Sequence, residues 1–199
     1  MSARRVAVTG LGMVSAVGAT AAGSFDALLA GRSGLRLHTP EHAPVPLALP
    51  AGTCADFDPA AALGRARAGT LDRYSQLGVT AGLAAWRDAG LAEAPGGNRD
   101  AWGVAWGTSL GGTLTFERGY RELFAAGRDR VAPLTVVQAM TNACASHLAI
   151  GLGLGGACTT YSVACASAAI AIGEGLRRVR SGSAPVVLAG GRMPRSPSA

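Results

Sequence analysis

The feature that most constrains the fold is a strand-to-helix junction in the second half of the chain. Residues 157–163 have strand character, a cysteine follows at position 165, and residues 166–180 repeat small and apolar residues at helical spacing. A second apolar run, residues 184–189, predicts a buried strand after this helix. A strand–helix–strand succession of this kind is typical of parallel strands covered by their connecting helix.

Cys165 lies where the predicted helix begins. The first turn of a helix carries unpaired backbone N–H groups and the positive end of the helix dipole, and both favour a negatively charged sulfur. The thiolate is the nucleophilic form of cysteine, so this position suits covalent catalysis. The alternative is a buried structural cysteine beside small residues, because free cysteine is among the most buried residue types.

The rest of the chain also alternates between strands and helices. Strands are predicted at residues 5–9 and 102–106, and helices at residues 24–30, 71–89, 117–126 and 133–151. This alternation predicts an α/β fold with a mixed, mostly parallel sheet and helices on both faces. Residues 35–59 are rich in proline and are predicted to be a long surface loop. Asp72, Arg73 and Arg87 are expected on the solvent side of their helix.

Composition places the chain among folded globular proteins. Its 199 residues are 49% hydrophobic and 15% charged, which supplies a large core and excludes general disorder. All 18 basic residues are arginine, so no lysine side chain can act as an amine nucleophile. The net charge of +6 comes from arginines spread along the chain, a pattern that does not favour nucleic-acid binding.

The cysteines and the N-terminus further limit the class of protein that this chain can be. The cysteines have no CxxC spacing and do not cluster with the histidines, so neither a metal site nor a disulfide framework is expected. Reduced thiols fit a cytoplasmic protein. The N-terminus lacks the apolar core of a signal peptide, and no run of about 18 apolar residues predicts a membrane span. We therefore expect a cytoplasmic protein that binds no membrane and no metal.

Residues 107–111, Gly-Thr-Ser-Leu-Gly, match the G-x-S-x-G pattern of a hydrolase nucleophile elbow. In that interpretation Ser109 is the nucleophile, and Asp129 and His147 are the downstream acid and histidine. Gly112 is a poor start for the helix that such an elbow needs. His147 lies among alanine, leucine and isoleucine, which favours a partly buried histidine over a general base.

Four stretches then occur in a characteristic order. They are residues 8–18 (Val-Thr-Gly-Leu-Gly-Met-Val-Ser-Ala-Val-Gly), 107–112, 163–168 (Val-Ala-Cys-Ala-Ser-Ala) and 187–191 (Val-Leu-Ala-Gly-Gly). Together they resemble the N-terminal half of the β-ketoacyl-(acyl carrier protein) synthases of the type II elongating class. The resemblance implies half of a thiolase-like fold, with a β-ketoacyl synthase N-terminal domain at residues 1–191 and an unstructured tail at 192–199.

The resemblance also implies a reaction and partners. Cys165 matches the nucleophile that takes an acyl chain from the phosphopantetheine of an acyl carrier protein; the family binds no other cofactor. The acyl group then undergoes decarboxylative Claisen condensation in fatty-acid or polyketide biosynthesis. Leu110 falls at a pocket residue that limits acyl-chain length, and residues 157–163 fall where two subunits pair. The residues near the carrier-protein docking region are Arg65, Arg67 and Arg73.

The sequence departs from the family after Gly191. Family members are about twice as long, and their second half supplies two histidines, a lysine and a glycine-rich loop. We therefore expect a truncated or frameshifted half-domain that carries the nucleophile and has lost condensation by itself. A non-catalytic partner that pairs with a complete ketosynthase is one alternative, and a serine hydrolase using Ser109 is another.

Overall fold

The structure is a computed structural model of the chain. It describes residues 4–39, 47–92 and 98–192, so the predicted tail lies outside the described residues except for Arg192. Within these ranges no helix is both long enough and apolar enough to cross a bilayer. The elements in chain order are α1 (Ala21–Leu29), β1 (Leu35–His38), β2 (Leu49–Gly52), α2 (Pro59–Leu63), α3 (Arg65–Gly69), α4 (Arg73–Asp88), η1 (Arg99–Ala101), β3 (Gly103–Gly107), α5 (Thr113–Tyr120), η2 (Arg121–Ala125), α6 (Thr135–Ala139), α7 (Ala143–Leu152), β4 (Cys158–Tyr161), η3 (Ala164–Ala166), α8 (Ser167–Ser181) and β5 (Val187–Gly191).

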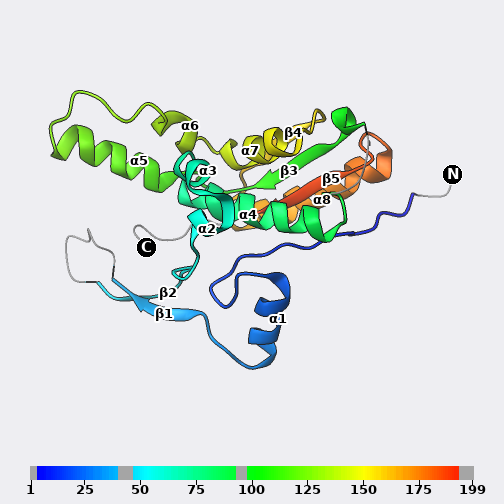
Figure 1. Cartoon of the computed structure of the whole chain (residues 1–199), viewed down its shortest axis with the longest axis horizontal. Coiled ribbons are helices and arrows are strands. Elements are labelled where there is room, and N and C mark those ends of the chain that lie inside the picture. Colours follow the sequence, from blue (N-terminus) through cyan, green and yellow to red (C-terminus); the bar gives the residue numbers. More distant parts are fainter. Residues whose placement is uncertain (1–3, 40–46, 93–97, 193–199) are drawn as a thin grey trace.

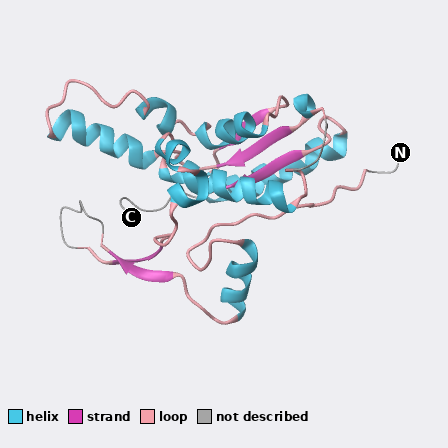
Figure 2. Cartoon of the chain, in the orientation of Figure 1, coloured by secondary structure: helices cyan, strands magenta, loops and turns pink. Residues whose placement is uncertain are grey.

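Three parallel strands form a sheet in the order β4-β3-β5, which lies among the helices in the upper part of the view in Figure 2. Val104 of β3 lies opposite Cys158 on one side and Leu188 on the other. Every residue of β3 is buried, as expected of a central strand covered on both faces. The three strands predicted around this sheet are confirmed, with ends that differ by a few residues.

Helices cover both faces of the sheet (Figure 1). On one face α8 lies so close to β5 that a Cβ added to Gly175 would be 2.8 Å from Cβ of Ala189. On the other face α4 and α7 pack together, and Leu188 contacts the core that they share with β3. The largest fully buried side chains of this core include Tyr74 and Leu148. The α/β arrangement expected from the alternating pattern is confirmed.

The N-terminus of α4 corrects one prediction. Asp72 was expected in solvent, but it is only 5% exposed. Its Oδ1 accepts the backbone N–H of Tyr74 at 2.9 Å and caps α4, while its Oδ2 accepts the N–H and the hydroxyl of Thr115 at 3.0 and 2.7 Å. Because both oxygens of the carboxylate accept hydrogen bonds, one at the helix cap and one from another element, the side chain can be buried.

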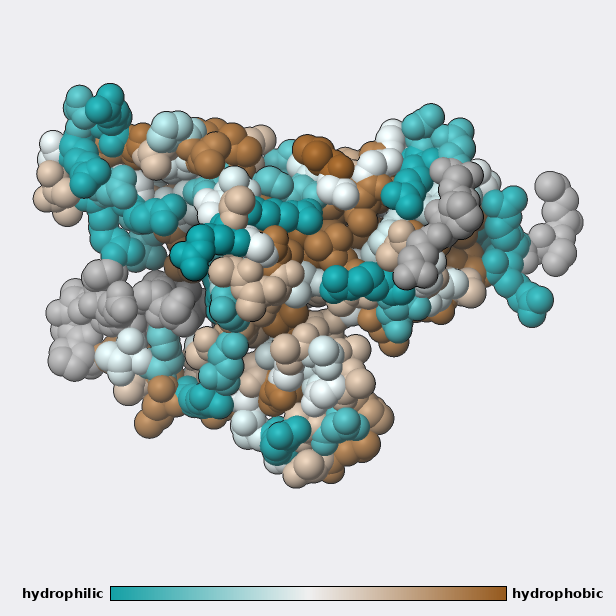
Figure 3. Space-filling model, viewed as in Figure 1, coloured by the Kyte–Doolittle hydropathy of each residue, from teal (hydrophilic) through white to brown (hydrophobic). Residues whose placement is uncertain are grey.

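The helix predicted at residues 133–151 is divided into α6 and α7. Met140, after α6, has an extended ψ of 139°, which ends the helical hydrogen bonding. The helix predicted at residues 117–126 is α5 followed by the π-helical turn η2. Figure 3 shows apolar residues gathered over α6, and exposed aromatic residues, Phe116 and Tyr120, also lie on α5. Phe124 on η2 is 80% exposed and Val136 on α6 is 64% exposed, so this surface lacks a cover within the described chain.

The N-terminal arm, which we define as residues 4–39 and 47–58, corrects two further predictions. Residues 5–9 form no strand, because no strand of the described chain pairs with them. Within 35–59, the predicted loop contains an antiparallel pair, in which Leu35 of β1 lies opposite Gly52 of β2. Helix α1 matches the predicted helix, and its chain reverses at Gly31, whose φ is 68°. In Figure 1 the hairpin and α1 lie below the sheet.

Candidate active site

Cys165 lies in the single turn η3, between the end of β4 and the first residue of α8. The thiol-bearing residue is exposed. A 15-residue helix begins two positions later, so Cys165 comes directly before a helix terminus that carries a partial positive charge. The predicted strand-to-helix position of Cys165 is confirmed, and the alternative of a buried cysteine at this position is wrong.

The backbone turns sharply just before this cysteine. Ala164 has φ 47°, and it is the only residue other than glycine with a positive φ in the described part of the chain. An L-residue in this region is strained by roughly 1–2 kcal/mol. The hydroxyl of Ser167, which is 3% exposed, accepts the N–H of Val163 at 2.8 Å and donates to the carbonyl of Ala164 at 2.7 Å. We call residues 163–167 the cysteine elbow.

The G-x-S-x-G stretch packs directly beneath the cysteine elbow. A Cβ added to Gly107 would lie 2.3 Å from the backbone carbon of Ser167, so only glycine lets the helix start rest on the end of β3. The hydroxyl of Ser162 donates to the carbonyl of Ser109 at 3.0 Å. The N–H of Thr108 donates to the carbonyl of Tyr161 at 3.0 Å. These contacts give residues 107–111 a supporting role next to Cys165.

The geometry of a serine hydrolase is missing around Ser109. Among the described residues, no histidine or carboxylate forms a hydrogen bond with its side chain. Helix α5 begins at Thr113, after a turn in which Gly111 has φ 65°. His147 lies on α7 with its carbonyl bound by the guanidinium of Arg67. Burial, and secondarily Arg67, lower the pKa of His147, as expected for a partly buried neutral imidazole.

Leu110 lies at the tip of the turn that follows β3, and it is 61% exposed. The two glycines after it pack tightly against α6. A Cβ on Gly112 would lie 2.4 Å from the carbonyl oxygen of Gln138. Leu110 therefore lies on a tightly packed turn at the same end of the parallel sheet as the cysteine elbow.

The structure separates the three arginines proposed to bind a partner. Arg65 on α3 is exposed. Arg67 is partly buried and holds α7 through the carbonyl of His147 at 3.2 Å. Arg73 donates to the carbonyls of Cys54 and Phe57 at 2.7 and 3.1 Å, and burial lowers the pKa of its guanidinium. Arg73 thus joins the N-terminal arm to α4, and its expected place in solvent is wrong.

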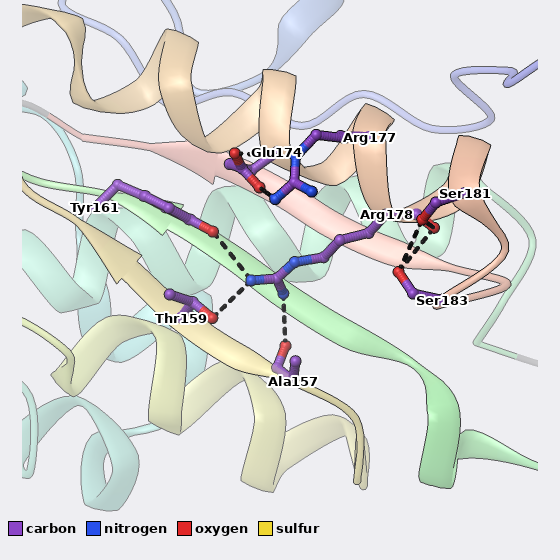
Figure 4. A network of polar contacts seen from close by, with 8 residues as sticks. All are labelled: Ala157, Thr159, Tyr161, Glu174, Arg177, Arg178, Ser181 and Ser183. Carbon is purple, nitrogen blue, oxygen red and sulfur yellow. Dashed lines mark hydrogen bonds and ion pairs between the residues drawn. The ribbon is translucent and has the colours of Figure 1, made fainter.

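Strand β4, which leads into the cysteine elbow, is held by an arginine of α8 (Figure 4). Arg178 donates to the carbonyl of Ala157 at 3.0 Å, the hydroxyl of Thr159 at 2.7 Å and the hydroxyl of Tyr161 at 3.0 Å. The contact between Arg178 and this strand was not predicted from the sequence. The alternation of Thr159 and Tyr161 on one face of a strand was the available signal for the contact.

The other cysteines have different surroundings. Cys144 is completely buried in the core, and burial raises the pKa of its thiol far above the ordinary value. Partial burial raises the pKa of the Cys158 thiol, and the positive charge of Arg178 opposes this shift. Among the described residues, no group of three or more histidines, cysteines or carboxylates is placed to hold a metal ion.

The structure places an exposed cysteine on an elbow that joins a parallel strand to a helix in an α/β fold, and comparison with known proteins gives the family. Residues 3–195 match the family model described as the beta-ketoacyl synthase, N-terminal domain. The chain therefore belongs to the beta-ketoacyl synthase family.

Curated relatives agree with this assignment. The chain is 37% identical over 193 residues to a 3-oxoacyl-[acyl-carrier-protein] synthase 2 of Vibrio cholerae, a match that covers 96% of the chain and 46% of that protein. It is 34% identical to the Nodulation protein E of Rhizobium meliloti, over 94% of the chain and 46% of the relative. The chain thus spans about half the length of the curated relatives that it matches.

Solved structures show the same fold. The ishigamide ketosynthase/chain length factor aligns with a TM-score of 0.83 at 29% identity, over 96% of this chain and 47% of that one. A beta-ketoacyl synthase from Burkholderia phymatum aligns with a TM-score of 0.73 at 28% identity, over 91% of this chain and 45% of that one. The fold is therefore that of one half of a thiolase-like ketosynthase.

Proposed function

We propose that Cys165 accepts an acyl group from the phosphopantetheine thiol of an acyl carrier protein. The observation that carries the proposal is an exposed cysteine on a strained elbow at the start of the 15-residue helix α8. In this step Sγ of Cys165 forms a bond to the thioester carbonyl carbon, and the bond from that carbon to the pantetheine sulfur breaks. The released pantetheine sulfur takes up one proton, which replaces the proton that Cys165 lost.

The start of α8 stabilises the two negatively charged species of this step, the thiolate and the oxyanion. Helix N-terminal N–H groups stabilise the thiolate before attack. They also stabilise an oxyanion on the tetrahedral intermediate, and the backbone N–H of Cys165 is the proposed oxyanion donor. Leu110, exposed on the neighbouring strand end, is the proposed contact for the acyl chain.

The later condensation needs groups that this chain does not supply. The 199 residues contain no lysine, and His147 is tied to the α3–α7 contact by its backbone. We propose that chemistry within these residues stops at the acyl-enzyme. Decarboxylative condensation, in fatty-acid or polyketide biosynthesis, then depends on residues supplied from outside them.

The proposed carrier-protein contact is now centred on Arg65. Arg65 is exposed, whereas Arg67 and Arg73 donate to backbone carbonyls within the chain. An acidic carrier protein would be attracted by this exposed guanidinium. A cytoplasmic location and pairing with a second ketosynthase chain through β4 belong to the same proposal. In the described chain β4 is an edge strand of its sheet, which leaves one side of it open for such pairing.

Acyl loading followed by peptide mass spectrometry tests the proposal. The 199-residue chain is incubated with acyl carrier proteins charged with short and long acyl groups, and each cysteine peptide is quantified. We expect an acyl adduct on Cys165 that is absent from Cys165→Ala and retained in Cys158→Ala. An unmodified Cys165 in the wild-type chain would reject the proposal.

A non-catalytic partner of a complete ketosynthase is the second candidate. The exposed edge of β4 and the apolar surface over α5 and α6 favour it. Co-expression with a complete ketosynthase distinguishes the two. A stable complex without an adduct on Cys165 would support the partner role, and labelling of Ser109 by a fluorophosphonate would instead support a hydrolase.

A further inference from the structure

We infer that Ser167 is the positioning residue that holds the cysteine elbow in its strained form and so aims Cys165 outward. The inference rests on the proposed nucleophilic role of Cys165. Ser167 is the first residue of α8, and its side chain is almost completely buried. Its hydroxyl bonds the backbones of Val163 and Ala164, so its effect on Cys165 passes through the backbone.

The two hydrogen bonds of Ser167 reach both sides of the strained residue. Its hydroxyl accepts from Val163 N–H, before Ala164, and donates to the Ala164 carbonyl, after the φ and ψ bonds of that residue. A third bond, from Ala166 N–H to the Val163 carbonyl at 3.0 Å, closes the turn. Without the hydroxyl, the Val163 N–H loses its partner and the Ala164 carbonyl keeps only the backbone N–H of Ser167, so Ala164 can relax toward a negative φ.

Relaxation of Ala164 would turn Cys165 away from its present direction. A change of sign in φ rotates everything on one side of that bond, and Cys165 is the next residue. The helix itself cannot follow, because Gly107 supports the Ser167 backbone at closest packing. The bond from Ser162 to the Ser109 carbonyl fixes the other end of the loop. Residues 163–166, between these two fixed ends, are therefore the part of the elbow that can change its conformation.

The same contacts explain the glycine-rich stretch that resembles a hydrolase elbow. Gly107 is required by the close approach of Ser167, and Ser109 contributes its backbone carbonyl. The stretch is the support on which the cysteine elbow rests.

Alkylation of the 199-residue chain by iodoacetamide tests the inference without requiring acyl transfer. The rate at Cys165 is measured relative to the rate at Cys158 in the same molecules. We expect Ser167→Ala to lower this ratio about tenfold, equivalent to ~1.4 kcal/mol, and Ser167→Thr, which keeps the hydroxyl, to restore it. Ser24→Ala is the matched control, because Ser24 is 1% exposed and its hydroxyl bonds Ser15 and Gly18 far from the elbow.

A double-mutant cycle distinguishes positioning from general stability. Glycine adopts a positive φ without strain, so Ala164→Gly should remove most of the dependence on Ser167. We expect Ser167→Ala to cost about tenfold in the wild-type background and less than about threefold in the Ala164→Gly background. If Ser167→Ala alone does not fold, Ala164→Gly/Ser167→Ala is expected to fold and to keep a reactive Cys165.

Three outcomes would overturn the inference. They are an unchanged ratio in Ser167→Ala, an equal loss in Ser24→Ala, and equal losses in the two Ala164 backgrounds. With acyl carrier protein as the substrate, the acylation kcat should fall while KM stays constant, because the docking surface is untouched. If the wild-type chain is alkylated at Cys165 but never acylated, the proposed function fails while the positioning of the elbow is still measured.

Discussion

The sheet with its covering helices and the N-terminal arm are built from similar residues but are packed in opposite ways. In the sheet unit, Leu148 of α7 is completely buried and contacts Gly82 of α4. In the arm, Leu29 of α1 is 72% exposed and Leu37 of β1 is 77% exposed. A leucine in this chain therefore stabilises only where a second layer lies over it.

The attachment of the arm shows the reason for this difference. Gly10 and Gly12 touch the α4 backbone, and a Cβ on either would lie within 2.2 Å of a carbonyl oxygen of that helix. Asp88 accepts the Leu11 N–H at 2.8 Å. These contacts are made by the backbone of the arm, and they leave most of its large apolar side chains uncovered. We infer that the arm depends on a further surface for most of its apolar burial.

The same substitution at two leucines tests this difference in packing most directly. Leu148→Ala should destabilise the chain by about 3–4 kcal/mol, because it opens a cavity between α4 and α7. Leu29→Ala should change stability by less than ~0.5 kcal/mol. Urea unfolding followed by circular dichroism measures both. Similar midpoints for the two variants would contradict the contrast between the regions.

Two glycines test how tightly the sheet unit is packed near the elbow. Gly107→Ala should destabilise by about 3 kcal/mol, because the new methyl meets the Ser167 backbone. Gly173→Ala is the control. Gly173 lies on α8, the helix that Gly107 contacts, and a Cβ added to it would meet nothing within 4 Å. The substitution should stabilise by up to ~1 kcal/mol through helix propensity. Equal effects in thermal unfolding would show that β3 and α8 are not in close contact.

Arg178 tests whether the edge of the sheet is held by polar contacts. Arg178→Met should cost about 1–2 kcal/mol, since the hydroxyls of Thr159 and Tyr161 on β4 lose their donor and the carbonyl of Ala157 keeps only the N–H of Val104. It should also raise the pKa of Cys158 further and slow its alkylation at neutral pH, because Arg178 opposes the shift caused by burial. Arg177→Met, which removes an exposed pair with Glu174, is the control. A pH profile of Cys158 alkylation that is the same in both variants would disprove the role of Arg178.

His147 gives the smallest expected effect. Its folded pKa is below the ordinary 6.5 because burial, and then Arg67, disfavour the imidazolium. The unfolded chain therefore binds more protons in the range just below pH 6.5, and stability should fall as the pH drops through that range. His147→Gln should remove this part of the acid sensitivity. Urea midpoints between pH 5 and 8 that change in parallel for both chains would contradict the assignment.

Local patterns predicted the elements of the sheet unit well. The apolar runs at residues 102–106 and 184–189 became β3 and β5, and the periodic stretch at 71–89 became α4. These segments carry their own signals, which are uninterrupted apolar runs, helical spacing and a terminating glycine. The position of Cys165 was predictable for the same reason, because a strand, a small-residue helix and the cysteine between them are contiguous.

Predictions failed where a residue depends on distant partners. The segment at residues 5–9 has strand-forming side chains, but no described strand pairs with it. Asp72 and Arg73 were placed in solvent because of their charge, yet Asp72 bonds the buried Thr115, and Arg73 bonds the backbones of the partly buried Cys54 and Phe57. Hydrogen-bond partners that lie tens of residues away leave no periodic trace in the sequence.

The sequence by itself determined that a cysteine stands between a parallel strand and a helix, since that information lies in adjacent residues. Only the tertiary structure decided that Ala164 is held at a positive φ, that Ser167 bridges it, and that Gly107 supports the helix start from another strand. The physical reason is that strain is maintained only by surrounding contacts, and those contacts form when β3, β4 and α8 pack together.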